Sequence, residues 1–287
     1  MTRIAVTGGS GKLGRAVVRH LVEEGHQVYN LDRTPSPDAL APYIQIDLTD
    51  PGQVHEALRS TEDVYDGIDA VVHLGAIPRP GLTTNSATFD NNIRSTHNVF
   101  AAAKSAGIRN VVWASSETVL GLPLGPENPP PYIPVDEEYH PQPNSSYSLA
   151  KTLEEEMALQ FCRWDPALKM IGLRFSNVMY PEDYREFPSF DADPATRVWN
   201  MWGYIDARDG AQAVRKAVEL DATGMQVFVI ANADTVMSRS SLSLAEEVFP
   251  DVPLRRRDLG QHETLLSIDK ARRILGFDPQ HSWRNEI

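Results

Sequence analysis

A tyrosine and a lysine in the pentapeptide YSLAK have the types and the spacing of a proton-transfer pair. Tyr147 and Lys151 are four residues apart, which on a helix places both side chains on one face, about 5–6 Å apart at Cβ. An ammonium beside a phenol stabilises the phenolate and lowers the phenol pKa from its ordinary value of about 10. The same spacing also occurs on amphipathic helices that carry no chemistry, so the rest of the chain has to decide.

A glycine-rich segment, TGGSGKLG, is the second candidate. Gly8, Gly11 and Gly14 follow an apolar run and open a helical pattern. In a strand–turn–helix unit such glycines permit a tight bend and bring a pyrophosphate close to a helix N-terminus. Asp32 ends the next apolar run, roughly 20 residues on, where an acid bonds the adenosine ribose hydroxyls of a dinucleotide. The segment therefore predicts dinucleotide binding, and the alternative is a turn whose glycines serve packing alone.

The choice between NAD and NADP depends on the charges around Asp32. This carboxylate favours NAD, because it repels the additional 2′-phosphate of NADP. Arg33 beside it, with Lys12 and Arg15 in the glycine turn, are able to pair with that phosphate instead. NAD is the favoured cofactor and NADP remains open.

The elements that must position these residues follow from the pattern of apolar runs. Runs rich in Val and Ile, several without polar alternation, predict strands covered on both faces. The predicted strands are residues 3–8, 26–32, 43–48, 69–76, 110–116, 169–177 and 226–232. The predicted helices are residues 12–24, 51–59, 87–106, 147–163 and 206–220, with short ones near 241–248 and 268–275. This alternation predicts a Rossmann-like, doubly wound α/β fold with a parallel sheet.

Two segments interrupt the alternation. Residues 122–146 are rich in proline, which excludes a helix interior or a central strand, and predict an ordered surface loop leading to Tyr147. The residues after Asn177 have mixed character and clustered aromatic side chains. We therefore expect a dinucleotide-binding domain and a small, discontinuous substrate lobe. The expected domain is residues 1–177 plus 206–232, and the expected lobe is residues 178–205 plus 233–287.

Composition and charge limit the class of protein. At 287 residues, with 41% hydrophobic and 23% charged residues, the chain has the composition of a soluble globular protein. The net charge of −12 argues against general binding to nucleic acid or membrane surfaces, although two or three local arginines suffice for a small anion. No apolar run approaches the ~20 residues of a membrane span and no secretory signal is evident, so we expect a cytoplasmic enzyme.

Cysteine and histidine usage indicates neither a disulfide nor a metal site. The single cysteine, Cys162, lies among apolar residues in LQFCRW and is expected to be structural. The eight histidines include no pair of the H-x-x-x-H kind. No metal is therefore expected.

A phenol that transfers a proton needs a partner to hold the substrate oxygen. Ser116 ends the strand predicted at 110–116, and ligands of open parallel sheets lie beyond the carboxyl ends of the strands. Ser115 is an alternative, and both serines otherwise fit a solvent-facing turn. Asn92, in the helix predicted at 87–106, is placed to bond backbone or a water behind Lys151, or to fill the helix interior.

In their order along the chain, these motifs resemble those of the extended short-chain dehydrogenase/reductase family, also called the epimerase/dehydratase superfamily. The resemblance covers nearly the whole length and is more specific than any one motif. It rests on TGGSGKLG (7–14), DLTD (47–50), HLGA (73–76), NNIRSTHNV (91–99), SSETVLG (115–121), YSLAK (147–151) and SIDKARRILGFDP (267–279). It favours YSLAK as an active site.

The resemblance implies the following roles. Tyr147 exchanges a proton with the substrate oxygen, Lys151 lowers the phenol pKa and bonds the nicotinamide ribose, and Ser116 holds the reacting oxygen. Hydride passes between a substrate carbon and the nicotinamide ring. The implied cofactor-binding residues are Gly8, Ser10, Gly11, Lys12, Leu13, Gly14, Asp32, Arg33, Asp47, Leu48, Leu74, Gly75, Ala76, Asn92, Tyr147 and Lys151. Relatives commonly dimerise through the helices predicted at 87–106 and 147–163, so a homodimer is expected.

The segment RFSNVMYPEDYR (174–185) is similar to uronate dehydrogenases, which oxidise a sugar acid and hold its carboxylate with an arginine at the place of Arg185. The expected substrate-binding residues are Arg79, Ser115, Ser116, Glu117, Asn177 and Arg185. Guanidinium groups favour carboxylate or phosphate ligands, although surface arginines also pair with neighbouring acids such as Glu182. The subgroup has Asn-His where this chain has Glu117-Thr118, so the substrate contacts must differ.

Three functions fit these residues. The favoured one is a dehydrogenase or reductase for a sugar, a sugar acid or a related small polar substrate. The alternative is a nucleotide-sugar epimerase or dehydratase that retains NAD, although dehydratases of the family carry Asp-Glu where this chain has Glu117-Thr118. The third is a dinucleotide-binding sensor without turnover, which would have no need of Ser116, Tyr147 and Lys151.

Overall fold

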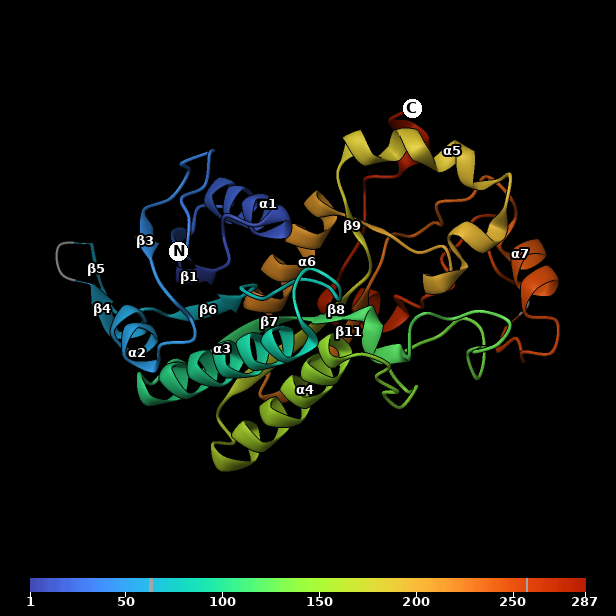
Figure 1. Ribbon diagram of the computed structural model, residues 1–287. Helices are drawn as coiled ribbons and strands as arrows, with labels where there is room; N and C mark the ends of the chain where they lie inside the picture. The colour runs from blue at the N-terminus through green and yellow to red at the C-terminus, as the bar shows by residue number, and fades with distance from the viewer. Residues whose placement is uncertain (62–63, 257) are drawn as a thin grey trace.

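The computed structural model describes residues 1–61, 64–256 and 258–287. Over these residues the central sheet has seven strands in the order β11-β8-β7-β6-β1-β2-β3 (Figure 1). The strands are β1 (Arg3–Thr7), β2 (Gln27–Asp32), β3 (Tyr43–Gln45), β6 (Ala70–His73), β7 (Asn110–Ser116), β8 (Lys169–Phe175) and β11 (Gly224–Ile230). Every neighbouring pair runs parallel. The predicted doubly wound α/β fold is confirmed.

Helices cover both faces of this sheet. They are α1 (Lys12–Glu23), α2 (Pro51–Arg59), α3 (Asn85–Ser105), α4 (Ser146–Trp164) and α6 (Ala207–Glu219). Successive side chains of a strand point to opposite faces. Ile4 and Val6 of β1 accordingly join the hydrophobic cluster beneath α1 and α6, whereas Ala5 joins the one beneath α2, α3 and α4. The sheet is therefore the middle of three layers.

Shorter elements complete the described chain. They are β4 (Ser60–Thr61), β5 (Tyr65–Asp66), β9 (Val178–Met179), β10 (Ile205–Asp206), α5 (Phe187–Phe190), α7 (Ser241–Val248) and the turns η1 (Glu117–Leu120), η2 (Pro181–Glu186), η3 (Pro194–Thr196), η4 (Val198–Asn200), η5 (Ala271–Leu275) and η6 (Trp283–Asn285). The helix predicted at 268–275 is for the most part the π-type turn η5, which Gly276 ends with a φ of 66°. Glycine adopts this left-handed conformation without a steric cost.

The proline-rich loop, residues 122–146, is fixed to the C-terminal third of the chain. Its Ile133 N–H donates to the Pro253 carbonyl at 3.0 Å, and its Val135 N–H donates to the Leu265 carbonyl at 2.9 Å. Both side chains are fully buried. The loop is ordered, as predicted, and it leads directly into α4.

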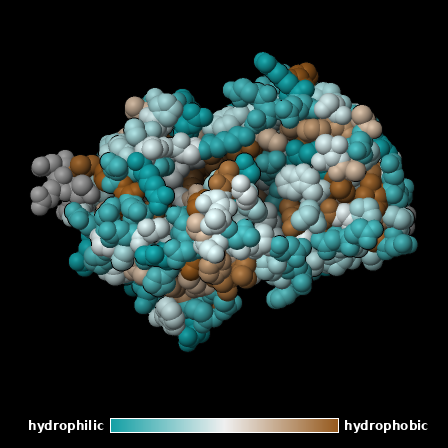
Figure 2. Space-filling view, viewed as in Figure 1, coloured by the Kyte–Doolittle hydropathy of each residue, from teal (hydrophilic) through white to brown (hydrophobic). Residues whose placement is uncertain are grey.

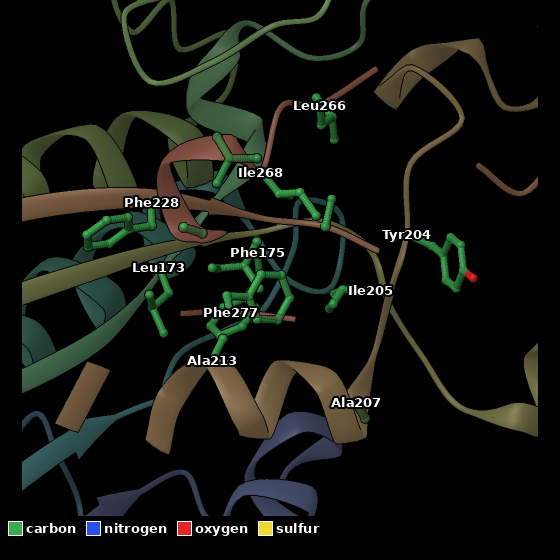
Figure 3. Packing of buried hydrophobic residues seen from close by; sticks show 14 of the residues in the cluster. Leu173, Phe175, Tyr204, Ile205, Ala207, Ala213, Phe228, Leu266, Ile268 and Phe277 are labelled. Carbon is green, nitrogen blue, oxygen red and sulfur yellow. The ribbon is translucent and has the colours of Figure 1, made fainter. Parts of the chain in front are cut away.

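Residues 178–205 lie beyond the carboxyl end of β8 (Figure 1). The C-terminal segment packs beside them and back over β11, where Lys270 Nζ donates to the Val227 carbonyl at 2.7 Å. Figure 3 shows Ile268 and Phe277 of the C-terminal segment close to Phe175 of β8, above α6. Figure 2 shows that the face in view is largely hydrophilic, with hydrophobic residues within a hollow.

Candidate active site

A cavity of about 930 Å³ opens at the carboxyl ends of the central strands. Its size is typical of a site for a small molecule or a cofactor. The predicted site residues that line it are Gly8, Ser10, Gly11, Lys12, Leu13, Gly14, Asp32, Arg33, Leu48, Leu74, Gly75, Ala76, Arg79, Ser115, Ser116, Glu117, Tyr147, Lys151 and Asn177. The glycine turn and the proton-transfer residues therefore share one cavity.

The turn between β1 and α1 is shaped to approach a phosphate. A Cβ on Gly14 would lie 2.1 Å from the Gly8 carbonyl oxygen, and one on Gly8 would lie 2.6 Å from the backbone nitrogen of Gly75. Helix α1 begins after Gly11 without a side-chain cap. Its first N–H groups, at the positive end of the helix dipole, are therefore suited to an anionic ligand. These residues fit the diphosphate of a dinucleotide.

Asp32 is held at the end of β2 by backbone groups. Its carboxylate accepts hydrogen bonds from the Ser10 N–H at 3.0 Å and from the Thr34 N–H at 3.3 Å. Asp47 lies outside the residues that line the cavity and pairs with Arg33 at 3.0 Å. The Thr49 N–H and hydroxyl, followed by Arg33, lower the Asp47 pKa to about 2. Asp47 therefore holds Arg33 from outside the cavity.

Tyr147 lies in the first turn of α4, which Ser145 caps by accepting a hydrogen bond from the Ser148 N–H at 3.0 Å. The phenol is 7% exposed. Burial raises its pKa, while Lys151 and a hydrogen bond with Ser116 lower it, and the net direction is upward. The spacing alone predicted a lowered pKa. That prediction is wrong for the protein without a bound cofactor. Desolvation of the phenolate raises the pKa by more than the Lys151 ammonium lowers it.

Lys151 is buried between a carbonyl and a carboxylate. Its Nζ donates to the Ala114 carbonyl at 2.8 Å and to Glu154 Oε2 at 2.9 Å. Burial opposes the ammonium form, but Glu154 and the phenol favour it, so the pKa of Lys151 is raised. The lysine therefore remains charged at physiological pH. The sequence analysis did not identify Glu154.

The structure distinguishes the two serines at the end of β7. The Ser115 hydroxyl donates to Glu155 at 2.6 Å, and Glu155 in turn holds Arg174 at 2.7 Å. The Ser116 hydroxyl instead accepts hydrogen bonds from Thr118 and interacts with the Tyr147 phenol. Ser116 is therefore the serine that shares a hydrogen bond with the phenol.

Asn92 is fully buried and bonds the loop after β6. Its Oδ1 accepts from the Ile77 N–H at 2.8 Å, and its amide donates to the Ile77 carbonyl at 3.0 Å. Of the roles predicted for it, the backbone role is the one its contacts match. It fixes the loop that carries Pro78 and Arg79 into the cavity wall.

Glu117 is a buried acid in the cavity wall. It is 3% exposed, and its Oε1 accepts from the Asn200 amide at 3.1 Å. Within the described residues its Oε2 has no hydrogen-bond partner. Burial raises the Glu117 pKa to about 7, against smaller opposing effects of Ser176, Asn200 and Arg197. It is therefore an acid that exchanges a proton near neutral pH.

The two arginines expected to bind substrate differ in position. Arg79 is exposed and lines the cavity, whereas Arg185 is exposed on η2 and does not line it. Trp199 and Ser176 line the cavity and were not predicted. Trp199 belongs to the segment of mixed character after β9, where no periodic pattern indicated which side chains face inward.

In the described part of the chain, no helix is long and apolar enough to cross a membrane. The same residues include no group of three His, Cys, Asp or Glu side chains arranged to hold a metal ion.

Comparison with known proteins adds to this geometry. Residues 4–231 match the model of the NAD dependent epimerase/dehydratase family. The chain is 30% identical to an L-arabinose 1-dehydrogenase (NAD(P)(+)) of Haloferax volcanii, over 76% of this chain and 83% of that protein. It is 24% identical to an NAD-dependent glucose-6-phosphate dehydrogenase of the same organism, over 96% and 92%. A mutated uronate dehydrogenase has the same fold, with a TM-score of 0.67 and 22% identity over 100% of this chain and 85% of that one.

Proposed function

Because the chain belongs to the NAD dependent epimerase/dehydratase family, we propose that it is an NAD-dependent dehydrogenase or reductase acting on a sugar or a sugar acid. The observation that carries the proposal is one cavity lined both by the glycine turn and by Ser116, Tyr147 and Lys151. Two relatives are named as dehydrogenases, one of a free sugar and one of a phosphorylated sugar, and they support this reaction class.

NAD is the cofactor that the charges favour. The Asp32 carboxylate lines the cavity and is fixed by the Ser10 N–H at 3.0 Å. Arg33, a candidate partner for a 2′-phosphate, is engaged by Asp47 at 3.0 Å. A fixed carboxylate repels the phosphate, and a compensated guanidinium attracts it less.

The protein residues supply the proton and the orientation. A bound nicotinamide would supply the hydride acceptor or donor. Tyr147 exchanges the proton with the substrate oxygen. Ser116 positions that oxygen next to the phenol. Lys151 keeps a buried positive charge behind the phenol. Such proton transfer by a positioned side chain contributes about 10²–10⁴-fold to rate.

We assign substrate recognition to the residues that enter the cavity from the segments after β6, β7 and β8 and from η4. Glu117 and Asn177 are polar groups suited to hydroxyls, Arg79 is suited to a carboxylate or phosphate, and Trp199 offers an apolar face. Arg185 lies outside this set, so the carboxylate contact of uronate dehydrogenases is not reproduced by that residue here. Residues 178–205 plus 233–287 form the substrate lobe in this proposal.

Two contacts of Lys12 favour the alternative of an epimerase or dehydratase that retains its cofactor. Lys12 in the glycine turn pairs with Asp183 of η2 at 2.7 Å, and the Tyr180 hydroxyl donates to the Lys12 carbonyl at 2.7 Å. These bonds tie the turn to the substrate side and would slow release of a dinucleotide. NAD that stays with the purified protein and is not reduced by any sugar would identify this alternative.

The deciding experiment is a screen of sugars, sugar acids and nucleotide-sugars with NAD and NADP, followed by NADH or NADPH absorbance. Net reduction by a sugar or sugar acid is expected, with a preference for NAD. The Tyr147→Phe variant serves as the control, because it removes the proton-transfer group and little volume. Full activity in this variant would overturn the assignment of the phenol.

We also propose that the chain forms a homodimer through α3 and α4. Leu149, Leu153 and Leu159 of α4 are 42%, 38% and 49% exposed, and contact with a second copy would bury these apolar side chains. Sedimentation of a dilute sample as a monomer would contradict this arrangement.

A further inference from the structure

Glu154 is a carboxylate buried in direct contact with the lysine of the active site. It lies on α4, three residues after Lys151, and is 0% exposed. Its Oε2 is 2.9 Å from the lysine Nζ. The Thr96 side chain of α3 also favours the ionised form of this carboxylate. Burying a carboxylate costs free energy unless a cation compensates its charge. Lys151 is the cation that compensates the buried Glu154.

The other charged groups around Lys151 are compensated or neutral. Glu155, also on α4, is held by the Arg174 guanidinium of β8 at 2.7 Å and by the Ser115 hydroxyl. His73 of β6 lies between the hydroxyls of Thr7 and Thr96, and burial, with Lys151, lowers its pKa to about 3. His73 is therefore neutral.

Two acids near the Tyr147 phenol remain to be considered. Glu117 of η1 acts on the phenol, but its raised pKa of about 7 leaves it largely protonated below neutral pH. Glu154 also acts on the phenol. Burial raises the Glu154 pKa, while the Lys151 ammonium at 2.9 Å lowers it and so favours the ionised carboxylate. Of the described acids around this lysine, Glu154 therefore most directly offsets the charge that Lys151 exerts on Tyr147.

We propose that Glu154 is a positioning residue, which holds the Lys151 ammonium against the Ala114 carbonyl and offsets its charge, so that Tyr147 stays protonated to a higher pH. The inference rests on the proposed function of the site. Both ends of the Asn92 amide bond Ile77, whereas Glu154 is in direct contact with the Lys151 ammonium at 2.9 Å.

The test replaces the charge and keeps the shape. Glu154→Gln leaves a hydrogen-bond acceptor beside Lys151 and removes the negative charge. Glu156→Gln, on the exposed face of the same helix, is the matched control. In the direction of alcohol oxidation, where the phenol acts as a base, kcat/KM is measured from pH 5 to pH 9 with a substrate from the screen. At the lowest pH values, kcat/KM divided by the maximal kcat/KM of the same variant should be about tenfold higher in Glu154→Gln than in the wild type. The reason is that removing a charge so close to the phenol lowers the phenol pKa by about one unit or more.

A second readout needs no substrate. Binding of NAD is followed by titration calorimetry in two buffers of different ionisation enthalpy, which gives the protons released on binding at each pH. The positive nicotinamide favours loss of the phenol proton, and the pH of half-maximal release should be lower in Glu154→Gln than in the wild type and in Glu156→Gln. Absence of NAD binding in the wild type would refute the proposed function. Binding with identical release curves in wild type and Glu154→Gln would refute the role of Glu154 alone.

A purely structural role for Glu154 predicts a different result. Glu154→Gln would then lower the melting temperature and leave the pH profile and the proton release unchanged, and this outcome overturns the inference. If Glu154→Gln does not fold, Glu154→Asp is used in its place. Aspartate keeps the negative charge but is one methylene shorter, so its carboxylate lies farther from Lys151. It should shift both curves in the same direction by a smaller amount, and unchanged curves in that variant would equally overturn the inference.

Discussion

The buried acid at position 117 makes the stability of the protein depend on pH in a way that a single substitution can remove. The Glu117 pKa is raised from an ordinary 4.5 to about 7, chiefly by burial. The folded protein therefore holds this proton more tightly than the unfolded chain does. Below pH 4.5 both states are protonated and the carboxyl costs nothing. As the pH rises towards 7 the unfolded chain loses the proton first, and the stability of the folded state falls.

The size of the effect follows from the shift. Each pKa unit corresponds to about 1.4 kcal/mol, so above pH 7 the buried Glu117 lowers the free energy of unfolding by about 3 kcal/mol. Between pH 5 and pH 8 this loss grows by about 2–3 kcal/mol. For a chain of this length, with an unfolding entropy of about 2 cal/mol/K per residue, that difference corresponds to about 4 °C in melting temperature.

Thermal unfolding of Glu117→Gln and wild type at pH 5 and pH 8 measures this cost. Glutamine keeps the acceptor for the Asn200 amide, and it cannot ionise. The melting temperature of the variant relative to the wild type should rise by about 4 °C from pH 5 to pH 8. Glu127→Gln, at an exposed position of the proline-rich loop, should show no such change. An equal difference at both pH values would mean that Glu117 is not held in its neutral form.

Three further outcomes are expected. Tyr147→Phe should lower kcat/KM by about 10²–10⁴-fold while NADH fluorescence still reports binding, and retained turnover would exclude the phenol as the proton-transfer group. Asp32→Ala should raise the ratio of NADP to NAD activity by about tenfold or more, because it removes the charge that repels a 2′-phosphate; an unchanged ratio would show that Asp32 does not face that position. Gly14→Ala should cost about 1–3 kcal/mol of stability and abolish dinucleotide binding, since its Cβ would lie 2.1 Å from the Gly8 carbonyl. Gly125→Ala is the control, because a Cβ added there would meet no atom within 4 Å. Equal losses in both variants would contradict the packing argument.

The sheet and the motifs on it were predictable because they depend on local pattern. Val-rich runs and their helical partners give the order of strands and helices, and the parallel sheet then brings the ends of β1 and β7 to one edge. Gly8 and Ser116 therefore reach the same cavity, although they are distant in sequence. The bounds of α4, Ser146–Trp164, follow from the proline-rich loop before it and the apolar spacing within it.

Features that depend on tertiary packing were not predictable. Arg185 carries the right chemistry for an anionic substrate, but the fold of η2 leaves it on the surface. Asp47 was expected beside the cofactor, and it instead pairs with Arg33 outside the cavity lining. Spacing places Lys151 near Tyr147, but the pKa of the phenol depends on desolvation, which only the packed structure provides.

The run LEEE on α4 shows why sequence patterns mislead at this site. Three consecutive glutamates on a helix ordinarily indicate a solvated face. Consecutive residues of a helix point about 100° apart, so the three carboxylates leave α4 in different directions. Glu154 meets Lys151 and Glu155 meets Arg174, both within the interior, and Glu156 alone reaches solvent. Each buried glutamate is matched by one buried cation, one from its own helix and one from β8. The sequence contains both cations, but only the packing of α4 against the sheet assigns each acid its partner, and that assignment determines how much of the Lys151 charge reaches the phenol.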